Sequence, residues 1–482
     1  MQRFVSFISA AILSFGLAAQ QLNLNDRNTL PEIGVVAANA ISIDKERLVG
    51  DAIMRQMRGQ APVVGDPLLN EYIQDLGNRL VAQADNTKFP FNFFLVNNPE
   101  INAFAFYGGY IGVHTGLIYQ ASTESELASV LAHEVAHVTQ RHIARRMESA
   151  QRSGPLQIAS MLGGILLAMA DPEAGMAAIS ASSAAGQQAS INYTRDNEKE
   201  ADRIGLRILY QAGFDPTAAA SFFDRLVEKY RHKSKPPAFL LTHPLPESRV
   251  ADARARAGAY NSQERGSSLA FFLAKARIQA LYMFDADKNQ SYFRRQLDQA
   301  HPGLQLAARY GLALSLMRAE QPKQAQAQLT PLMDAHPDNL FFLDAMTDIL
   351  LDQQNYDQAM KMLAPHLANK PRNQVLALNY ANAAINAGQY KDAIRLLKDY
   401  LMINEDHMLS YQLLVEAYGQ SDQALERHQS QAEIYALVAA YPRAIDELQS
   451  AYNYTGDSHL AKQRIRARIE QFREAKNRLE RL

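Results

Sequence analysis

A period of 34 residues in the second half of the chain constrains its fold most strongly. An alanine returns at this spacing, followed four positions later by a leucine and, twice, twelve positions later by a proline. The recurring residues are Ala325, Ala359 and Ala393, then Leu329, Leu363 and Leu397, then Pro337 and Pro371. A small side chain lets two paired helices approach closely, because a larger one would push them apart. The period therefore predicts a stack of helical hairpins.

This spacing resembles that of the tetratricopeptide repeat. Three units fit it, and we expect one further unit before them and two degenerate units after them. The three units cover about 306–339, 340–373 and 374–407. The glycine usual in the first helix is replaced by Ala313, Thr347 and Ala381. The resemblance implies an all-α solenoid over residues 268–482 whose concave face binds peptides or proteins. The alternative is an array that only braces the first half.

The first half, about residues 40–262, follows a different pattern. Apolar residues at helical spacing occupy 66–84, whereas 91–96 and 110–113 have the composition of short strands bounded by turn residues. Further helices follow these strands. The order predicts an α+β domain with a small sheet.

The N-terminus has the layout of a secretory signal. Arg3 is the only charge in the first 25 residues, an apolar segment occupies 4–17, and small residues follow it. A basic start, a short apolar core and a small-residue cleavage site are typical of a signal peptide. We expect a signal peptide over residues 1–19 and export to a bacterial periplasm. An uncleaved N-terminal anchor is the alternative.

Composition excludes several classes of function. The chain has no cysteine, which excludes disulfides, a thiol nucleophile and any cysteine-ligated metal centre. Its 49 Lys and Arg balance 50 Asp and Glu, which argues against a general nucleic-acid binder. A metal site in this chain must therefore use histidines and carboxylates.

The segment His133-Glu134-Val135-Ala136-His137 is an H-E-x-x-H motif. Thr123 and Glu126 form a capping-box start, and apolar residues follow at helical spacing, so the motif belongs to an amphipathic helix. Residues four apart share one face of a helix, so both imidazoles can reach one Zn²⁺ ion. Glu134 then lies beside the metal, where it can take a proton from a bound water molecule.

A catalytic zinc ion needs a third protein ligand, and the pattern with a third histidine after the motif is absent. The candidate is the acidic segment 195–202. Glu198 and Asp202 share a helix face, so Glu198 could bind zinc while Asp202 accepts a hydrogen bond from a ligand histidine. Glu200 is a rival ligand. The same spacing also fits an ordinary charged surface helix.

Together these residues resemble the gluzincin metallopeptidases related to the prenyl-protein endopeptidase and the bacterial membrane heat-shock protease. The resemblance covers about residues 40–262. The matching motifs are HEVAH at 133–137, R-x-x-E-x-x-A-D at 195–202, NAFA at 102–105, GGYI at 108–111, TGL at 115–117 and THP at 242–244 with Arg249 after it. It implies a zincin-type α+β peptidase domain with Glu198 as the third zinc ligand.

The resemblance also implies roles for residues outside the HEVAH and R-x-x-E-x-x-A-D motifs. Gly109 to Val113 would be an edge strand beside the cleft, able to pair with an extended substrate. His243 and Arg249 would lie near the metal. A neutral His243 could take zinc's open position and hold the enzyme latent. Alternatively, His243 or Arg249 could stabilise the oxyanion of the reaction intermediate.

The combination of signal, peptidase and repeats resembles a family of periplasmic Gram-negative proteases that assist the assembly of outer-membrane β-barrel proteins. It implies a proteolytic and chaperone-like role, with unfolded or stalled outer-membrane proteins as substrates and the barrel-assembly machinery as a partner. A rival hypothesis is a repeat-based chaperone or adaptor whose peptidase site is largely latent. The intact HEVAH motif argues against a dead enzyme.

Two further segments lie close to the motifs. The apolar segment 156–170 is too short to span a bilayer, and we expect it to be a lid, with substrate binding or peripheral membrane contact as alternatives. His142 follows His137 by five residues and would lie off the zinc-facing side of the same helix. We expect it to have a structural role or to support a ligand.

Overall fold

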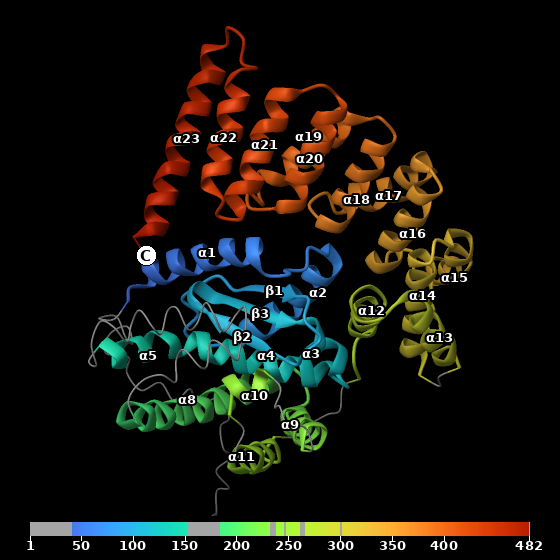
Figure 1. The fold of residues 1–482 in the computed structure, drawn as a ribbon. Helices are drawn as coiled ribbons and strands as arrows, with labels where there is room; N and C mark the ends of the chain where they lie inside the picture. Colours follow the sequence, from blue (N-terminus) through green and yellow to red (C-terminus); the bar gives the residue numbers. More distant parts are fainter. Residues whose placement is uncertain are drawn as a thin grey trace, which may run out of the picture.

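The computed structural model describes residues 41–151, 184–231, 238–244, 247–260, 266–298 and 301–481. The expected signal peptide and the expected lid over 156–170 lie outside these residues. Among the helices of the described ranges, none is long and apolar enough to cross a membrane. A small sheet with its helices forms one part of the molecule, and a curved array of helical pairs forms the other (Figure 1).

The sheet has three strands, β1 (Asn92–Val96), β2 (Ala103–Phe106) and β3 (Tyr110–His114). β3 lies in the middle, parallel to β1 and antiparallel to β2. The tight link η1 (Tyr107–Gly109) joins β2 to β3 through Gly108 and Gly109, whose φ angles are 80° and 86°. A Cβ atom on Gly109 would lie 2.4 Å from the carbonyl oxygen of Pro90, so the turn requires glycine there.

The expectation that Gly109 to Val113 forms an edge strand is wrong. β3 pairs on both sides, and the two edges belong to β1 and β2. The physical reason is the short link at η1, which folds β2 back as a hairpin against β3. The sequence pattern identifies 102–105 as a motif but does not predict a strand there.

Helices pack on both faces of this sheet. Alternate residues of β1 point to opposite sides, so Phe93 and Leu95 enter the large core while Phe94 and Val96 enter a second, smaller core. The large core includes α2 (Pro67–Val81), α3 (Thr115–Gln120), α4 (Glu124–Thr139) and α9 (Thr217–Tyr230). The smaller core includes α1 (Ile43–Gln60) and α5 (His142–Gln151). α8 (Ala184–Gln211) packs along α4, and α10 (Ala238–Thr242) and α11 (Glu247–Ala257) follow.

The second half of the chain is a stack of helical pairs, as the period predicted. The first helices are α12 (Leu269–Ile278), the π-helical turn η2 (Gln279–Met283) and α13 (Ala286–Gln296). The pairs that follow are α14 (Pro302–Arg318) with α15 (Pro322–Ala335), α16 (Leu340–Asp352) with α17 (Tyr356–Asn369), α18 (Gln374–Asn386) with α19 (Tyr390–Leu401), α20 (Met408–Gln420) with α21 (Ala424–Leu437), and α22 (Tyr441–Tyr452) with α23 (His459–Glu480). The repeated alanines 325, 359 and 393 are fully buried. Their small side chains lie where paired helices touch, which explains the period.

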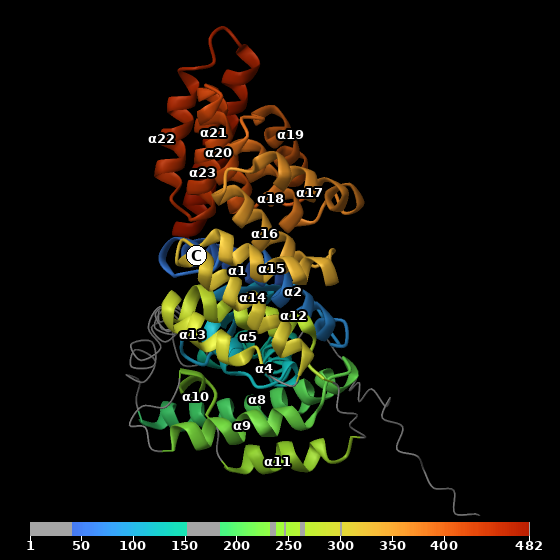
Figure 2. The ribbon, with the colours of Figure 1, turned by 90° about the vertical axis from the view of Figure 1, so that its right-hand side faces the viewer.

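The array arches over α1 and α2, and the C-terminus returns to a position beside α1 (Figures 1 and 2). Several contacts join the two parts. Arg55 on α1 donates to Asp406 at 3.1 Å, and Asn373 donates to Glu71 on α2 at 3.0 Å. The repeats are therefore docked on the first half of the chain through its N-terminal helices.

A buried arginine forms the centre of this junction. Arg277 on α12 donates to Asp66 at 2.6 Å, to Asp344 at 2.7 Å and to the hydroxyl of Tyr310 at 2.9 Å. The other oxygen of Asp66 accepts from the backbone N–H groups of Leu68 and Leu69 and so caps the N-terminus of α2. One carboxylate thus begins a helix of the first half of the chain and binds the first helix of the array.

Candidate metal centre

The HEVAH segment lies on α4, whose start is fixed by local hydrogen bonds. Thr123 is the N-cap, and its hydroxyl accepts from the backbone N–H of Glu126 at 3.2 Å. The Glu126 carboxylate reaches back to the N–H of Ser122 at 2.7 Å, one residue before the partner that a standard capping box uses. One turn apart on the same face, His133 and His137 point their Nε2 atoms to within 3.0 Å of each other.

α8 brings the acidic residues to this pair of histidines. Glu198 is buried, with its two oxygens 3.3 Å from Nε2 of His133 and 3.4 Å from Nε2 of His137. Close approach of the helices depends on Gly205, where a Cβ atom would lie 3.0 Å from the backbone nitrogen of His133. A side chain at position 205 would push Glu198 away from the histidines.

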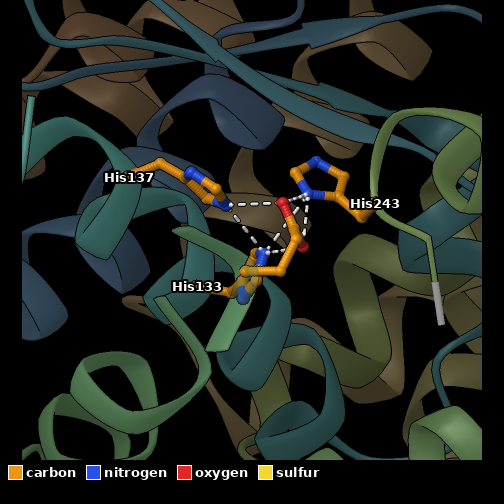
Figure 3. A group of neighbouring side chains, drawn as sticks. His133, His137 and His243 are labelled. Carbon is orange, nitrogen blue, oxygen red and sulfur yellow. Dashed lines mark hydrogen bonds and ion pairs between the residues drawn. The ribbon is translucent and has the colours of Figure 1, made fainter. Parts of the chain in front are cut away.

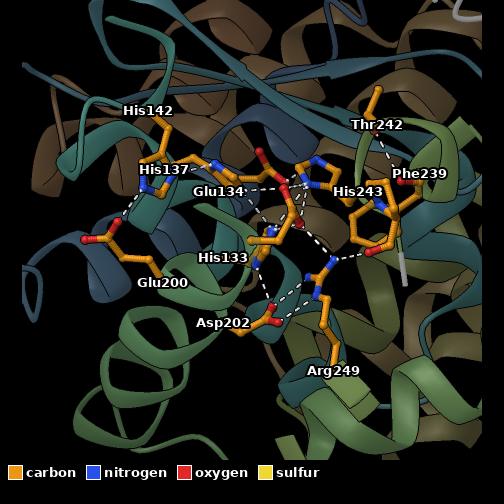
Figure 4. Close-up of polar contacts among 12 residues, drawn as sticks. His133, Glu134, His137, His142, Glu200, Asp202, Phe239, Thr242, His243 and Arg249 are labelled. Carbon is orange, nitrogen blue, oxygen red and sulfur yellow. Dashed lines mark hydrogen bonds and ion pairs between the residues drawn. The ribbon is translucent and has the colours of Figure 1, made fainter. Parts of the chain in front are cut away.

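Behind His133, a carboxylate and an arginine support the centre. Asp202 lies 3.1 Å from Nδ1 of His133, on the side of the ring away from Glu198. Arg249 on α11 contacts Asp202 at 2.7 and 2.8 Å, Glu198 at 2.9 Å and the carbonyl oxygen of Pro244 at 2.7 Å. Its guanidinium is almost fully buried and is directed at the carboxylates of Asp202 and Glu198 (Figure 4).

His243 enters the centre from the residue after α10. Its Nδ1 lies 3.1 Å from Glu198 and 3.3 Å from Nε2 of His133, and its Nε2 lies 3.3 Å from Glu134. The ring packs on Phe239, with 4.9 Å between ring centres. Figure 3 shows the three imidazoles arranged around one carboxylate. His243 is thus the fourth nitrogen or oxygen donor of the cluster.

The charges of the cluster depend on one another. Burial would raise the pKa of Glu198, but His243 and His137 hold it well below its usual value. Burial would also lower the pKa of His133, but hydrogen bonds and charge from Asp202 and Glu198 raise it to about 10. Burial lowers the pKa of His137 to about 3. Without a metal ion, a protonated His133 therefore lies between two ionised carboxylates.

The donor set fits a metal ion. His133, His137, Glu198 and His243 each offer a ligand atom, and these atoms lie within 4.8 Å of one another. Zinc–nitrogen bonds of about 2.0–2.1 Å in a tetrahedron require donors about 3.3–3.4 Å apart, close to the contacts of 3.0–3.4 Å between neighbouring donors. Both oxygens of Glu134 are buried without a well-formed hydrogen bond among the described residues, and Nε2 of His243 lies 3.3 Å from one of them. Such a carboxylate needs a polar group on the metal side.

The positions of two residues near the cluster, Glu200 and His142, differ from those expected from the sequence. Glu200, the rival ligand, points away from the cluster and pairs with His142 at 3.2 Å and with Arg145 at 2.9 Å. His142 does not continue the helix of His137, because α4 ends at Thr139 and α5 begins at His142. The expectation that both histidines share one helix is wrong, since the left-handed backbone of Arg141, with φ of 50°, interrupts it.

Comparison with known proteins identifies both parts. Residues 67–257 match peptidase family M48, and residues 350–418 match the tetratricopeptide repeat. The first part is also similar to the mitochondrial metalloendopeptidase OMA1 of Schizosaccharomyces pombe, with 27% identity over 44% of this chain and 61% of that protein. Fold, site and relatives together define a metalloendopeptidase that carries a tetratricopeptide-repeat region, and the expected fold class and enzyme class are confirmed.

Several relatives match nearly the whole chain, and two of them serve as examples. The beta-barrel assembly-enhancing protease of Escherichia coli is 44% identical over 94% of this chain and 92% of its own length. The protein of the same name from Yersinia pestis is 44% identical over 97% of this chain and 96% of its own length. The chain belongs to the family of beta-barrel assembly-enhancing proteases.

Proposed function

We propose that this protein is a periplasmic zinc endopeptidase that cleaves unfolded or stalled outer-membrane β-barrel proteins. The observation that carries the proposal is the convergence of His133, His137 and Glu198 beside the buried carboxylate of Glu134. The names of the full-length relatives support the substrate class. Residues 1–19 would be removed on export, 40–262 would form the peptidase domain and 268–482 the repeat domain.

In this proposal the ligands are His133, His137 and Glu198, with one zinc ion per chain. When bound, zinc would polarise the peptide carbonyl and lower the pKa of a water molecule beside it. The Glu134 carboxylate takes the proton from that water and passes it to the leaving amine. Asp202 accepts from Nδ1 of His133, so that Nε2 keeps its lone pair for the metal.

The position of His243 supports an inhibitory role. Its Nδ1 lies among the ligand atoms, and its Nε2 lies 3.3 Å from the proposed base, Glu134. A ring in this place occupies the position that a catalytic site keeps open. His243 would therefore be a fourth ligand that keeps the enzyme latent until the segment around α10 moves.

Arg249 is better suited to holding the carboxylates than to stabilising an oxyanion. Its guanidinium nitrogens already contact Asp202, Glu198 and the carbonyl of Pro244. An oxyanion donor must instead point at the place where charge develops. We therefore assign to Arg249 the orientation of the two acidic residues.

An extended substrate would pair with β2 rather than with β3. The outer edge of β1 is partly closed by the Gln74 side chain, which accepts from the N–H of Phe93 and donates to the carbonyl of Phe91, both at 3.0 Å. β2 is the other edge and packs beside α4, which carries the HEVAH motif. Backbone pairing along Ala103–Phe106 would lay a peptide across the site.

The repeats would recruit protein substrates or the outer-membrane barrel-assembly machinery. A second function, that of a chaperone or adaptor with a latent peptidase site, is favoured by the position of His243 in the cluster. The balanced charge argues against nucleic acid as a partner. The apolar segment 156–170 would make peripheral contact with a membrane surface.

The test measures metal content and cleavage of casein and of an unfolded porin by purified mature protein. We expect one zinc per chain and slow cleavage. Glu134→Gln should retain the zinc and lose about 10²–10⁴-fold or more of the rate. Protein that binds no zinc and cleaves nothing would overturn the proposed function. If Glu134→Gln binds zinc, cleaves nothing and still supports barrel assembly in cells, the chaperone function dominates.

A further inference from the structure

The two histidines of the HEVAH motif are supported in different ways. Nδ1 of His133 faces the Asp202 carboxylate at 3.1 Å. Nδ1 of His137 instead faces another imidazole, with 2.9 Å to Nδ1 of His142. Figure 4 shows His142 between His137 and Glu200.

This contact depends on the break between α4 and α5. On a continuous helix, a residue five positions after His137 lies about 140° away around the axis. Arg141 adopts a left-handed conformation, with φ of 50°, and turns the chain so that His142 returns to His137. A left-handed residue with a side chain costs about 1–2 kcal/mol, and buried contacts to Arg141 offset that cost. Its Nε donates to Glu46 at 2.8 Å, and its Nη2 donates to the carbonyl of Ile41 at 2.7 Å.

The chain of contacts continues beyond His142 to a charged pair. Nε2 of His142 lies 3.2 Å from the carboxylate of Glu200, which accepts from Arg145 at 2.9 Å. His142 is 4% exposed, and a neutral imidazole has one N–H donor and one acceptor nitrogen.

Only one arrangement of protons satisfies all these contacts when His137 binds a metal. Nε2 of His137 must keep its lone pair for the metal, so its proton lies on Nδ1. That N–H donates to Nδ1 of His142, which must then accept. The proton of His142 consequently lies on Nε2 and is donated to the Glu200 carboxylate, which can only accept.

We propose that His142 and Glu200 are positioning residues for the metal ligand His137. They fix its tautomer and its ring orientation, as Asp202 does for His133. The inference rests on the proposed function, because it assumes that His137 is a ligand. The support of His137 differs from that of His133, because an imidazole lies between the ligand and the carboxylate.

The experiment measures the zinc dissociation constant by competition with a chelator and compares two substitutions of one residue. His142→Phe keeps a ring but removes the acceptor, and we expect about 10–100-fold weaker zinc binding. His142→Asn keeps the acceptor, since the amide oxygen of asparagine lies where Nδ1 of histidine lies and can accept from His137. We expect His142→Asn to bind zinc within about threefold of the wild type, well inside the loss typical of a removed support.

A matched control lies in the repeats, where His428 pairs with Glu447 at 2.7 Å, far from the centre. His428→Phe should leave the zinc affinity unchanged. Absorption spectra of the cobalt-substituted proteins report the ligand set separately from activity, and they should show the same set in His142→Asn as in the wild type. If His142→Phe does not fold, Glu200→Ala tests the same support at a less buried position, with about tenfold weaker binding expected.

The outcomes distinguish a failure of the proposed function from a failure of this inference alone. A wild type that binds no zinc defeats the proposed function and this inference with it. A wild type that binds zinc, together with folded His142→Phe and Glu200→Ala variants of equal affinity, defeats this inference alone. An equal loss of affinity in His142→Phe and His142→Asn would also overturn it, because an acceptor facing His137 would then have no effect.

Discussion

Arg249 and Asp202 form a two-point contact, with 2.7 Å from Nε and 2.8 Å from Nη2 to the two carboxylate oxygens. The remaining nitrogen, Nη1, lies 2.9 Å from Glu198. Burial would raise the pKa of Asp202, but Arg249 and His133 hold it at about 2. One guanidinium therefore contacts both carboxylates and orients them around His133.

Arg249→Lys should weaken zinc binding by about 10–100-fold, because an ammonium group cannot contact both carboxylates in a fixed plane. Chelator competition measures the change. The control is Arg254→Lys on the same helix, whose partner Asp224 lies in an exposed pair, and it should bind zinc like the wild type. Equal affinities for both variants would show that the contact does not orient the ligands.

His243→Ala should cleave casein and unfolded porin faster than the wild type while retaining its zinc. The reason is that three ligands remain and the fourth position becomes free for water. Initial rates with matched zinc content measure the effect. A variant that binds zinc but is inactive would instead place His243 in the catalytic machinery.

Zinc affinity should rise with pH. The pKa of His133 is raised to about 10 in the metal-free site, because Asp202 and Glu198 outweigh the effect of burial. Its proton must leave before zinc binds, so uptake releases one proton, and the dissociation constant should fall about tenfold per pH unit between pH 6 and 8. Calorimetry in buffers of different ionisation enthalpy counts the released proton. An affinity independent of pH would contradict a protonated His133.

Arg277→Met should destabilise the protein by about 3–5 kcal/mol, because it leaves the buried carboxylates of Asp66 and Asp344 without their partner. Denaturant unfolding followed by circular dichroism measures the loss. Arg55→Met removes the half-exposed pair with Asp406 across the same junction and should cost about 1 kcal/mol or less. Similar losses for both variants would mean that the buried network has no special role.

Elements that depend on local patterns could be predicted from the sequence alone. The 34-residue period predicts the helical pairs, and the cap at Thr123 with the apolar spacing after it predicts α4. Residue spacing alone left Glu198 and Glu200 as rival ligands. In the structure Glu198 points at the two histidines, whereas Glu200 pairs with Arg145.

Features that depend on distant contacts could not be predicted from local patterns. β3 is the central strand because η1 folds β2 against it, and strand order is not visible in a run of five residues. The return of His142 to His137 requires a left-handed Arg141, which its contacts with Glu46, 95 positions earlier in the chain, help to hold. Residue propensity disfavours that conformation.

Asp66 connects the repeats mechanically to the peptidase core. It binds Arg277 of the array and caps α2, and α2 packs against α4. A force applied to the repeats by a bound polypeptide would therefore pass through the first turn of α2 to the helix that carries His133 and His137. The array is anchored to the part of the peptidase whose shape determines how the metal is held.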